Sequence, residues 1–325
     1  MTTNENAPDS VELSKGAKVR QPHKHYSTGR GRGKAAQTLA MIDAAHDILL
    51  EIEPASVRAV CYRLFVHGHI KGMHKNETQK VSRNLVYARE QGIIPWDWIV
   101  DETREPERVS TWRDPEHIIR AAVNTYRRDY WQDQPQRVEV WSEKGTIRGT
   151  LAPVLNEYGV TFRVMHGYTS ATSIQSAALE SLSSNKPLTI LYVGDWDPSG
   201  LHMSEVDLPS RLARYGGDAD IIRIALDEDD VTYGELPSFE AETKKGDTRY
   251  PWFTSRYGRK CWELDALPPP DLRERVENNI IERLDRGLWD RAVEVEQAET
   301  ESMREIMGTL NSILRPDSKY SGGDA

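Results

Sequence analysis

The sequence is poor in the features that mark several common classes of protein. Only two cysteines, Cys61 and Cys261, occur in 325 residues. They belong to no CxxC or Cys/His spacing, so neither a disulfide framework nor a zinc ribbon is expected. No apolar run approaches the roughly 20 residues that a membrane-spanning helix needs, and the polar start of the chain lacks the basic and then apolar pattern of a signal peptide. We therefore expect a soluble cytoplasmic protein.

A basic overall charge is also missing. The net charge is -9, which argues at first against nucleic acid, because DNA-binding proteins usually carry a basic surface. The charge is unevenly distributed, however: residues 1–134 contain 20 Lys+Arg and 18 Asp+Glu, whereas residues 135–325 contain 22 and 33. An acidic second part fits carboxylates gathered for metal binding, or an ordinary solvated acidic surface.

The length and the apolar content predict two domains. Residues 1–36 carry seven Lys and Arg among few large apolar side chains, which is typical of a disordered basic tail. We expect one domain at residues 37–134, a second at residues 135–316, and a short disordered tail at residues 317–325.

Three amphipathic helices are predicted in the first domain, from apolar residues at three- and four-residue spacing. Ser56 is a suitable cap for the second of them, and Gly92 suits the end of the third. The predicted ranges are 39–52, 56–68 and 78–92. The segment 93–101 is rich in β-branched and aromatic residues and indicates a strand or wing, and residues 104–134 read as a connecting helix and linker. This order is typical of a winged helix-turn-helix.

In a winged helix-turn-helix the third helix enters the major groove of DNA. The polar side chains that this helix would present to double-stranded DNA are Lys80, Arg83, Asn84 and Tyr87. The alternative is a helical subdomain with an ordinary charged solvent face.

From residue 137 onward, short β-branched segments alternate with amphipathic ones in a βαβαβαβ pattern. This alternation predicts an α/β domain with a parallel sheet flanked by helices, in which chemistry takes place at the carboxyl ends of the strands. A polar stretch, Lys244, Lys245, Asp247 and Arg249, precedes a Trp/Phe/Tyr cluster farther on. It either contacts DNA or forms an ordinary loop.

Acidic side chains follow two of the predicted strands. Glu143 comes after the first, in WSEKG, and Asp195 and Asp197 come after the third, in YVGDWDPSG. Like charges placed together cost free energy unless a cation neutralises them, and hard oxygen ligands suit Mg²⁺. The alternative is that Asp197 caps the following helix, which explains neither Glu143 nor Asp195. Lys144 either reaches a scissile phosphate or balances the carboxylates.

The Glu after one strand, the DxD after a later one and the βαβ spacing between them resemble a Toprim domain. The longer string GDWDPSG resembles the motif of the A subunit of type IIB topoisomerase (topoisomerase VI) and of the related meiotic double-strand-break transesterase. The segment CWELDALPP, with Glu263 and Asp265, resembles a late segment of the same family. The resemblance covers the Toprim half and extends to the winged helix.

In that family the DNA-cleaving tyrosine lies in a helix of the winged domain, within a pattern of Arg, any residue, Val or Ile, an aromatic residue and Tyr. Arg58 to Tyr62 match this pattern, except that Cys61 stands at the aromatic place. Helical periodicity places Tyr62 roughly 130° from the centre of the apolar stripe of its helix, with Arg58 one turn earlier on the same side. The alternative is a tyrosine that only packs against the sheet or linker.

The resemblance implies DNA cleavage by transesterification. Tyr62 would attack a backbone phosphate, Arg58 would orient that phosphate, and Mg²⁺ held by Glu143, Asp195 and Asp197 would stabilise the charge. The resemblance also implies a homodimer, in which each Tyr62 acts beside the metal site of the other subunit. We expect the protein to be associated with nucleoid or mobile-element DNA. No GxxxxGK loop and no GHKL-type ATPase segment is present, so strand passage driven by ATP would need a separate ATPase subunit.

Two other functions fit the same sequence. One is a metal-dependent nuclease, similar to the Toprim nuclease of the Wadjet plasmid-defence system, in which water attacks and Tyr62 has no chemical role. The other is a DNA-binding regulator that has lost catalysis.

Overall fold

The structure, a computed structural model, describes most of the chain but not its ends. The described residues are 36–100, 111–165, 171–184 and 186–314. Apart from Ala36, the two predicted tails lie outside these residues. None of the described helices combines the length and the apolar character needed to cross a bilayer.

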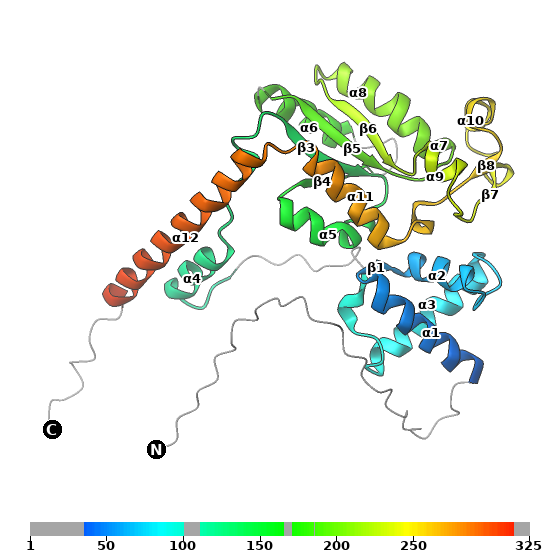
Figure 1. The fold of residues 1–325 in the computed structure, drawn as a ribbon, viewed down its shortest axis with the longest axis horizontal. Helices are drawn as coiled ribbons and strands as arrows, with labels where there is room; N and C mark the ends of the chain where they lie inside the picture. The colour runs from blue at the N-terminus through cyan, green and yellow to red at the C-terminus, as the bar shows by residue number, and fades with distance from the viewer. Residues whose placement is uncertain (1–35, 101–110, 166–170, 185, 315–325) are drawn as a thin grey trace.

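Three helices pack around an apolar core at the start of the described chain (Figure 1). They are α1 (Ala36–Ile52), α2 (Val57–Val66) and α3 (Lys75–Glu90). Ser56 caps α2 as predicted, because its hydroxyl accepts a hydrogen bond from the Ala59 amide at 3.1 Å. α3 begins after His74 rather than at Thr78, whose hydroxyl donates to the Lys75 carbonyl at 3.2 Å inside the first turn.

The segment after α3 differs from the predicted strand or wing at residues 93–101. Pro95 leads into a 3-10 turn, η1 (Trp96–Trp98), and only β2 (Ile99–Val100) is extended. β2 pairs in parallel with β1 (Ala55–Ser56). Proline fixes its own φ angle and favours the start of a turn, which explains why the apolar run does not form one strand. Residues 36–100 therefore contain three α-helices, one 3-10 turn and two short parallel strands, and Asp101, the last residue of the predicted wing, lies outside the described residues.

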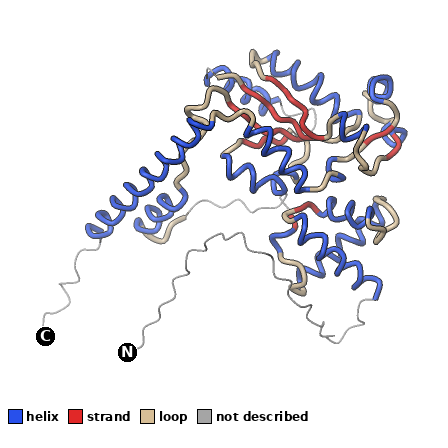
Figure 2. The backbone as a smooth tube through the Cα atoms, viewed as in Figure 1, coloured by secondary structure: helices blue, strands red, loops and turns tan. Residues whose placement is uncertain are grey.

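A four-stranded parallel sheet forms the centre of the larger region (Figure 2). Its strands are β3 (Arg137–Ser142), β4 (Thr161–Val164), β5 (Leu188–Val193) and β6 (Asp220–Ala225), in the spatial order β4-β3-β5-β6. The predicted α/β alternation is confirmed. β5 is buried at every position, as expected of a strand covered on both faces. The strand order places β3 and β5, the two strands followed by acidic motifs, next to each other.

Helices cover both faces of the sheet. One core contains side chains of α5 (Ile147–Tyr158) and α11 (Pro269–Ile281), and the other contains side chains of α6 (Ala171–Ser184) and α8 (Leu208–Arg214). The helix predicted after DWDPSG is interrupted: α7 (Pro198–His202) passes through a π-turn, η4 (Met203–Asp207), into α8. Pro209 has no N–H to continue an α-helical ladder, which accounts for the irregular turn before it.

A smaller set of elements follows β6. They are α9 (Glu228–Thr232), β7 (Phe239–Glu240), η5 (Ala241–Lys244), α10 (Tyr250–Tyr257), β8 (Lys260–Cys261) and η6 (Leu264–Ala266). After α11 the long helix α12 (Arg286–Leu314) leaves the sheet region and packs beside α4 (Pro115–Thr125) (Figure 1). The hydroxyl of Tyr126, just after α4, donates to Glu299 of α12 at 2.6 Å.

The helical region and the sheet region meet along β1 and α2. The Ser56 hydroxyl donates to the Asp265 carboxylate at 2.6 Å. On α11, the Arg273 guanidinium donates to the main-chain carbonyls of Glu53 and Pro54 at 3.2 and 3.3 Å. These contacts hold α2, which carries Tyr62, against the segment that contains η6.

Candidate active site

The carboxyl ends of β3 and β5 bring the predicted acidic residues to one edge of the sheet. Ser142 at the end of β3 is in register with Val193 at the end of β5. Glu143 follows the first directly, and Asp195 follows the second after one glycine. The two acidic motifs therefore lie at the same edge of the sheet.

The turn after β5 is tightly built. A Cβ atom on Gly200 would lie 2.3 Å from the carbonyl oxygen of Asp195, a separation that real Cβ atoms do not adopt. The first turn of α7 therefore packs directly on the backbone of the acidic motif, and only glycine permits that approach. This close approach explains why glycine stands at position 200, the last residue of DWDPSG.

Arg223 of β6 organises the same turn, and sequence reasoning missed it. Its guanidinium donates to the carbonyl oxygens of Gly194, Asp195, Leu226 and Gly200 at 3.0, 3.3, 3.0 and 2.7 Å. The side chain is partly buried, and burial lowers its pKa. Among the described residues no carboxylate forms an ion pair with Arg223, so carbonyl dipoles carry most of its stabilisation. An Arg in the strand beside the acidic motif was the only sequence signal that could have indicated it.

Asp195 is held by a backbone amide and a lysine. Its Oδ1 accepts the Leu264 amide at 2.7 Å and lies 2.8 Å from the Lys144 ammonium. Burial raises the pKa of Asp195, and Lys144 and the Leu264 amide offset only part of that rise. Lys144 also donates to Asp265 at 2.8 Å, so one ammonium joins two carboxylates from different segments.

Asp197 is the N-cap of α7 and also faces a cation. Its Oδ1 accepts the Gly200 amide at 2.7 Å, so the capping alternative is confirmed for this residue. Its Oδ2 lies 3.0 Å from the Lys244 ammonium. Because capping uses one oxygen and Lys244 faces the other, capping and a role at the site are compatible.

Glu143 interacts electrostatically with the two aspartates. Burial raises its pKa first, and the negative charges of Asp197 and Asp195 raise it further. Lys144 and Lys244 lower it by less than this sum. The edge thus carries three interacting carboxylates, and two lysines compensate their charge incompletely.

A divalent metal fits this donor set in part. No group of three or more His, Cys, Asp or Glu side chains in the described ranges is arranged to hold a metal ion. The two aspartates instead face Lys144 and Lys244. The donor chemistry is nevertheless that of a hard cation, because all three side chains offer carboxylate oxygens. Holding a metal would require the displacement of at least one lysine ammonium.

Tyr62 lies beside Arg58 and Glu263 and outside the apolar core of its own region. It is only 4% exposed, yet it does not belong to the apolar cluster that contains Val60, Cys61 and Leu64. This agrees with the predicted offset from the apolar stripe. Burial raises the pKa of Tyr62 most, the Glu263 carboxylate raises it further, and Arg58 and Lys144 offset only part of the rise. The phenol is therefore protonated at neutral pH.

Arg58 lies one turn before Tyr62, with its guanidinium carbon 6.0 Å from the centre of the phenol ring. Two of its nitrogens donate to the two carboxylate oxygens of Glu263. Arg58, Tyr62 and Glu263 thus form one group at the junction of the two regions. Because the guanidinium already forms two hydrogen bonds with Glu263, it would have to release Glu263 to contact a phosphate.

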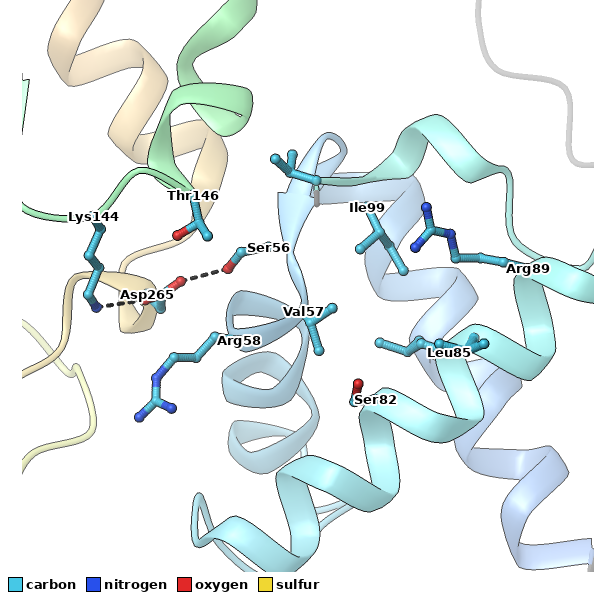
Figure 3. Close-up of a pocket in the computed structure, with 12 residues that line it drawn as sticks. Ser56, Val57, Arg58, Ser82, Leu85, Arg89, Ile99, Lys144, Thr146 and Asp265 are labelled. Carbon is cyan, nitrogen blue, oxygen red and sulfur yellow. Dashed lines mark hydrogen bonds and ion pairs between the residues drawn. The ribbon is translucent and has the colours of Figure 1, made fainter. Parts of the chain in front are cut away.

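A cavity of about 490 Å³ opens beside this group. Figure 3 shows Ser56, Arg58, Lys144 and Asp265 on one side of it and α3 on the other, with dashed lines joining Ser56, Asp265 and Lys144. Further lining residues are Ser82, Leu85, Arg89, Ile99 and Thr146. The cavity thus lies between the third helix and the residues next to the acidic edge.

The four DNA contacts predicted on α3 do not share one exposed face. Lys80 and Arg83 are exposed. Asn84 is 6% exposed and Tyr87 packs partly buried against the core of the helical region. The expectation that α3 displays Asn84 is wrong, because the position lies between the core residues Val81 and Leu85 on the inner side of the helix.

In comparisons with known proteins, no protein-family model and no curated protein matches this chain. The resemblance to type IIB topoisomerases therefore rests on the sequence motifs alone.

Proposed function

We propose that this protein cleaves DNA by transesterification, with Tyr62 as the nucleophile. The observation that carries the proposal is a continuous set of contacts from α2 to the acidic edge. Ser56 bonds Asp265, Asp265 pairs with Lys144, and Lys144 pairs with Asp195. A stability role alone does not require a buried tyrosine, an arginine and this carboxylate–lysine chain to converge on one junction.

In the proposed step the Tyr62 oxygen forms a bond to a backbone phosphorus and the bond from phosphorus to the 3′-oxygen breaks. The carboxylate of Glu263, which raises the pKa of the phenol, is placed to take the phenolic proton. Arg58, once released from Glu263, would hold the phosphate. The leaving 3′-oxygen takes a proton from Lys144 or from water.

Glu143, Asp195 and Asp197 would hold the Mg²⁺ that the motif resemblance implies. When bound, Mg²⁺ supplies stabilisation of the negative charge that develops on the phosphate and on the leaving oxygen. Lys144 and Lys244 pair with Asp195 and Asp197 in the structure, so they compensate part of the negative charge of the edge until substrate and metal arrive.

The test uses supercoiled plasmid and Mg²⁺, followed by denaturation in detergent and detection of protein attached to DNA. The wild type is expected to yield a covalent adduct and Tyr62→Phe to yield none. Tyr215→Phe is the matched control, because Tyr215 is a partly buried tyrosine in the other core of the sheet region. An adduct that survives Tyr62→Phe would exclude Tyr62 as the nucleophile.

Hydrolysis by water is the second candidate, and the burial of Tyr62 favours it. A phenol that is 4% exposed, with a raised pKa, is a weak nucleophile until the junction opens. A water-using nuclease needs the carboxylates but not Tyr62. Cleavage that persists in Tyr62→Phe without any adduct would assign this second function.

A homodimer is part of the proposal, because cutting both strands requires two tyrosines. In the described chain Tyr62 lies beside Glu263 of the same molecule. Light scattering of the purified protein, with and without duplex DNA, tests this part: a single 37.0 kDa species in both conditions would rule out paired strand cleavage by two copies.

A further inference from the structure

Residues 239–262 carry an excess of positive charge within the acidic half of the chain. This segment contains β7, η5, α10 and β8. We call it the basic hairpin unit. It carries six Lys and Arg and three Asp and Glu, whereas residues 135–325 as a whole carry 22 and 33. Its basic residues are Lys244, Lys245, Arg249, Arg256, Arg259 and Lys260. Positive charge concentrated in this way calls for an explanation other than solubility, which the surrounding acidic surface already provides.

The basic hairpin unit is attached directly to the acidic motif. The main chains of Trp196 and Trp262 exchange two hydrogen bonds, at 2.9 and 3.0 Å. The Trp196 ring lies against Tyr257 with centroids 5.5 Å apart, and Lys244 lies 3.0 Å from Asp197. The unit therefore extends the surface of the candidate active site along the side of α7.

The cations of this unit differ in how they are held. Lys244 and Arg249 pair with Asp197 and Asp247. Arg256 lies over the Trp252 ring, 5.1 Å from its centre, and this ring is itself braced by His202 of α7 at 5.2 Å. Stacking restrains the guanidinium without neutralising it.

Three further cations remain available to a ligand. Lys245, Arg259 and Lys260 are exposed, and no ion pair joins them to a carboxylate in the described ranges. The nearest acidic neighbour in the strand pairing is Glu240, which is in register with Lys260. Exposed ammonium and guanidinium groups in this number are the recognition chemistry of a phosphate backbone.

We infer that the basic hairpin unit binds the sugar-phosphate backbone of duplex DNA beside the carboxylate edge. This inference rests on the proposed function, since it names a surface that holds the DNA at that site. Lys245, Arg259 and Lys260 contact successive phosphates, and Arg256 contacts a further phosphate from its position on Trp252. The surface is distinct from Lys80 and Arg83 of α3, so the duplex is held on both sides of the junction.

The test measures binding of a fluorescent duplex to the full chain by anisotropy, without Mg²⁺, over a range of salt concentrations. The variant Lys245→Gln/Arg259→Gln/Lys260→Gln removes three exposed cations. We expect binding to weaken about tenfold or more, and the slope of log K against log salt to fall by about 2 to 3, because each phosphate contact contributes about 0.9 to it. The matched control, Lys71→Gln/Arg214→Gln/Arg291→Gln, removes three exposed cations from other surfaces and should retain the wild-type slope.

The outcomes separate this inference from the proposed function. If the triple variant keeps wild-type affinity and slope while the wild type binds and cleaves DNA, the inference is wrong and the proposed function stands. If the control loses as much as the triple variant, binding is nonspecific and the inference is again wrong. If the wild type does not bind the duplex at low salt, both fail. Circular dichroism of each variant shows that lost binding is not lost folding.

Discussion

The helical region, residues 36–100, and the sheet region, residues 137–281, bury different kinds of side chain. Among described residues of the helical region, only Ser56 and Asn84 are buried polar side chains. The sheet region buries several charged ones, Glu139, Asp197, Arg211, Asp230 and Asp265. The helical region is therefore held by apolar packing. In the sheet region, burying charged groups costs desolvation free energy, so these charges must be neutralised by partners.

The sheet region itself neutralises charge in two ways. At the amino end of β3 the buried Glu139 carboxylate accepts from Arg137, Trp141 and Arg163. At the carboxyl ends the compensating groups are Lys144 and Lys244. Arginine forks fix a carboxylate in place, whereas a lysine ammonium is a point charge on a flexible stem that can change partners. The difference indicates a structural cluster at one end of the sheet and an exchangeable site at the other.

The largest expected effect separates these two clusters. Asp195→Asn retains an acceptor for the Leu264 amide but removes a charge from the edge, so we expect DNA cleavage to fall about 10²- to 10³-fold with little loss of stability. Glu139→Gln should do the reverse, lowering the free energy of unfolding by about 3 kcal/mol and leaving the carboxylate edge intact. Cleavage rates and urea unfolding of both variants measure this. Equal loss of stability in the two would remove the distinction.

Arg223 tests whether the acidic turn depends on a partly buried cation. Arg223→Met should lower the free energy of unfolding by about 3 kcal/mol, because four main-chain carbonyl oxygens each lose a charged donor, and only some of them, such as Gly194 with the Leu226 amide, keep a second one. Arg214→Met, at an exposed position of α8, should change it by less than about 0.5 kcal/mol. Chemical denaturation of the two variants gives the comparison. A stability of Arg223→Met equal to the wild type would mean that the turn is fixed by Gly200 and the backbone alone.

Asp265 connects the two regions and predicts how their contact depends on pH. Burial raises its pKa, but Lys144 and then Ser56 lower it more, so the net shift is downward. A lowered pKa in the folded state stabilises the fold above the ordinary value near 4, and this contribution disappears as the pH falls through the folded-state pKa. Asp265→Asn should cost about 2 kcal/mol at pH 7.

The difference in free energy of unfolding between Asp265→Asn and the wild type should become smaller below about pH 4. Urea unfolding at pH values from 3 to 7 measures it. A gap that is constant with pH would show that the amide is simply a poorer fit and that the carboxylate charge has no role.

The smallest expected effect is at Ser56, which donates the hydrogen bond to Asp265. Ser56→Ala removes the cap of α2 and the hydrogen bond to Asp265, so we expect a loss of about 1 kcal/mol. Ser56→Thr keeps the hydroxyl and should recover most of that loss. Thermal unfolding followed by circular dichroism tests both. If Ser56→Thr is no better than Ser56→Ala, the loss comes from packing at β1 and not from the hydroxyl.

Much of the fold follows from local sequence signals. The helices of the first region follow from apolar spacing and the Ser56 cap, and the sheet follows from alternating β-branched segments, since both depend on neighbours within a few residues. The segment after Pro95 and the start of α3 were predicted less well. There the competing preferences of proline, aromatic and hydroxyl side chains are small, and packing decides between them.

The residue types after β3 and β5 can be read directly from the sequence, and the register of these parallel strands then brings Glu143 and Asp195 to one edge. Their partners, in contrast, depend on how the whole chain folds. Lys244, Asp265 and Arg223 come from segments far away along the chain, and no periodicity connects them to the acidic motif. The burial of Tyr62 was likewise decided by the docking of the two regions, because desolvation depends on everything that surrounds a group and not on its neighbours in sequence.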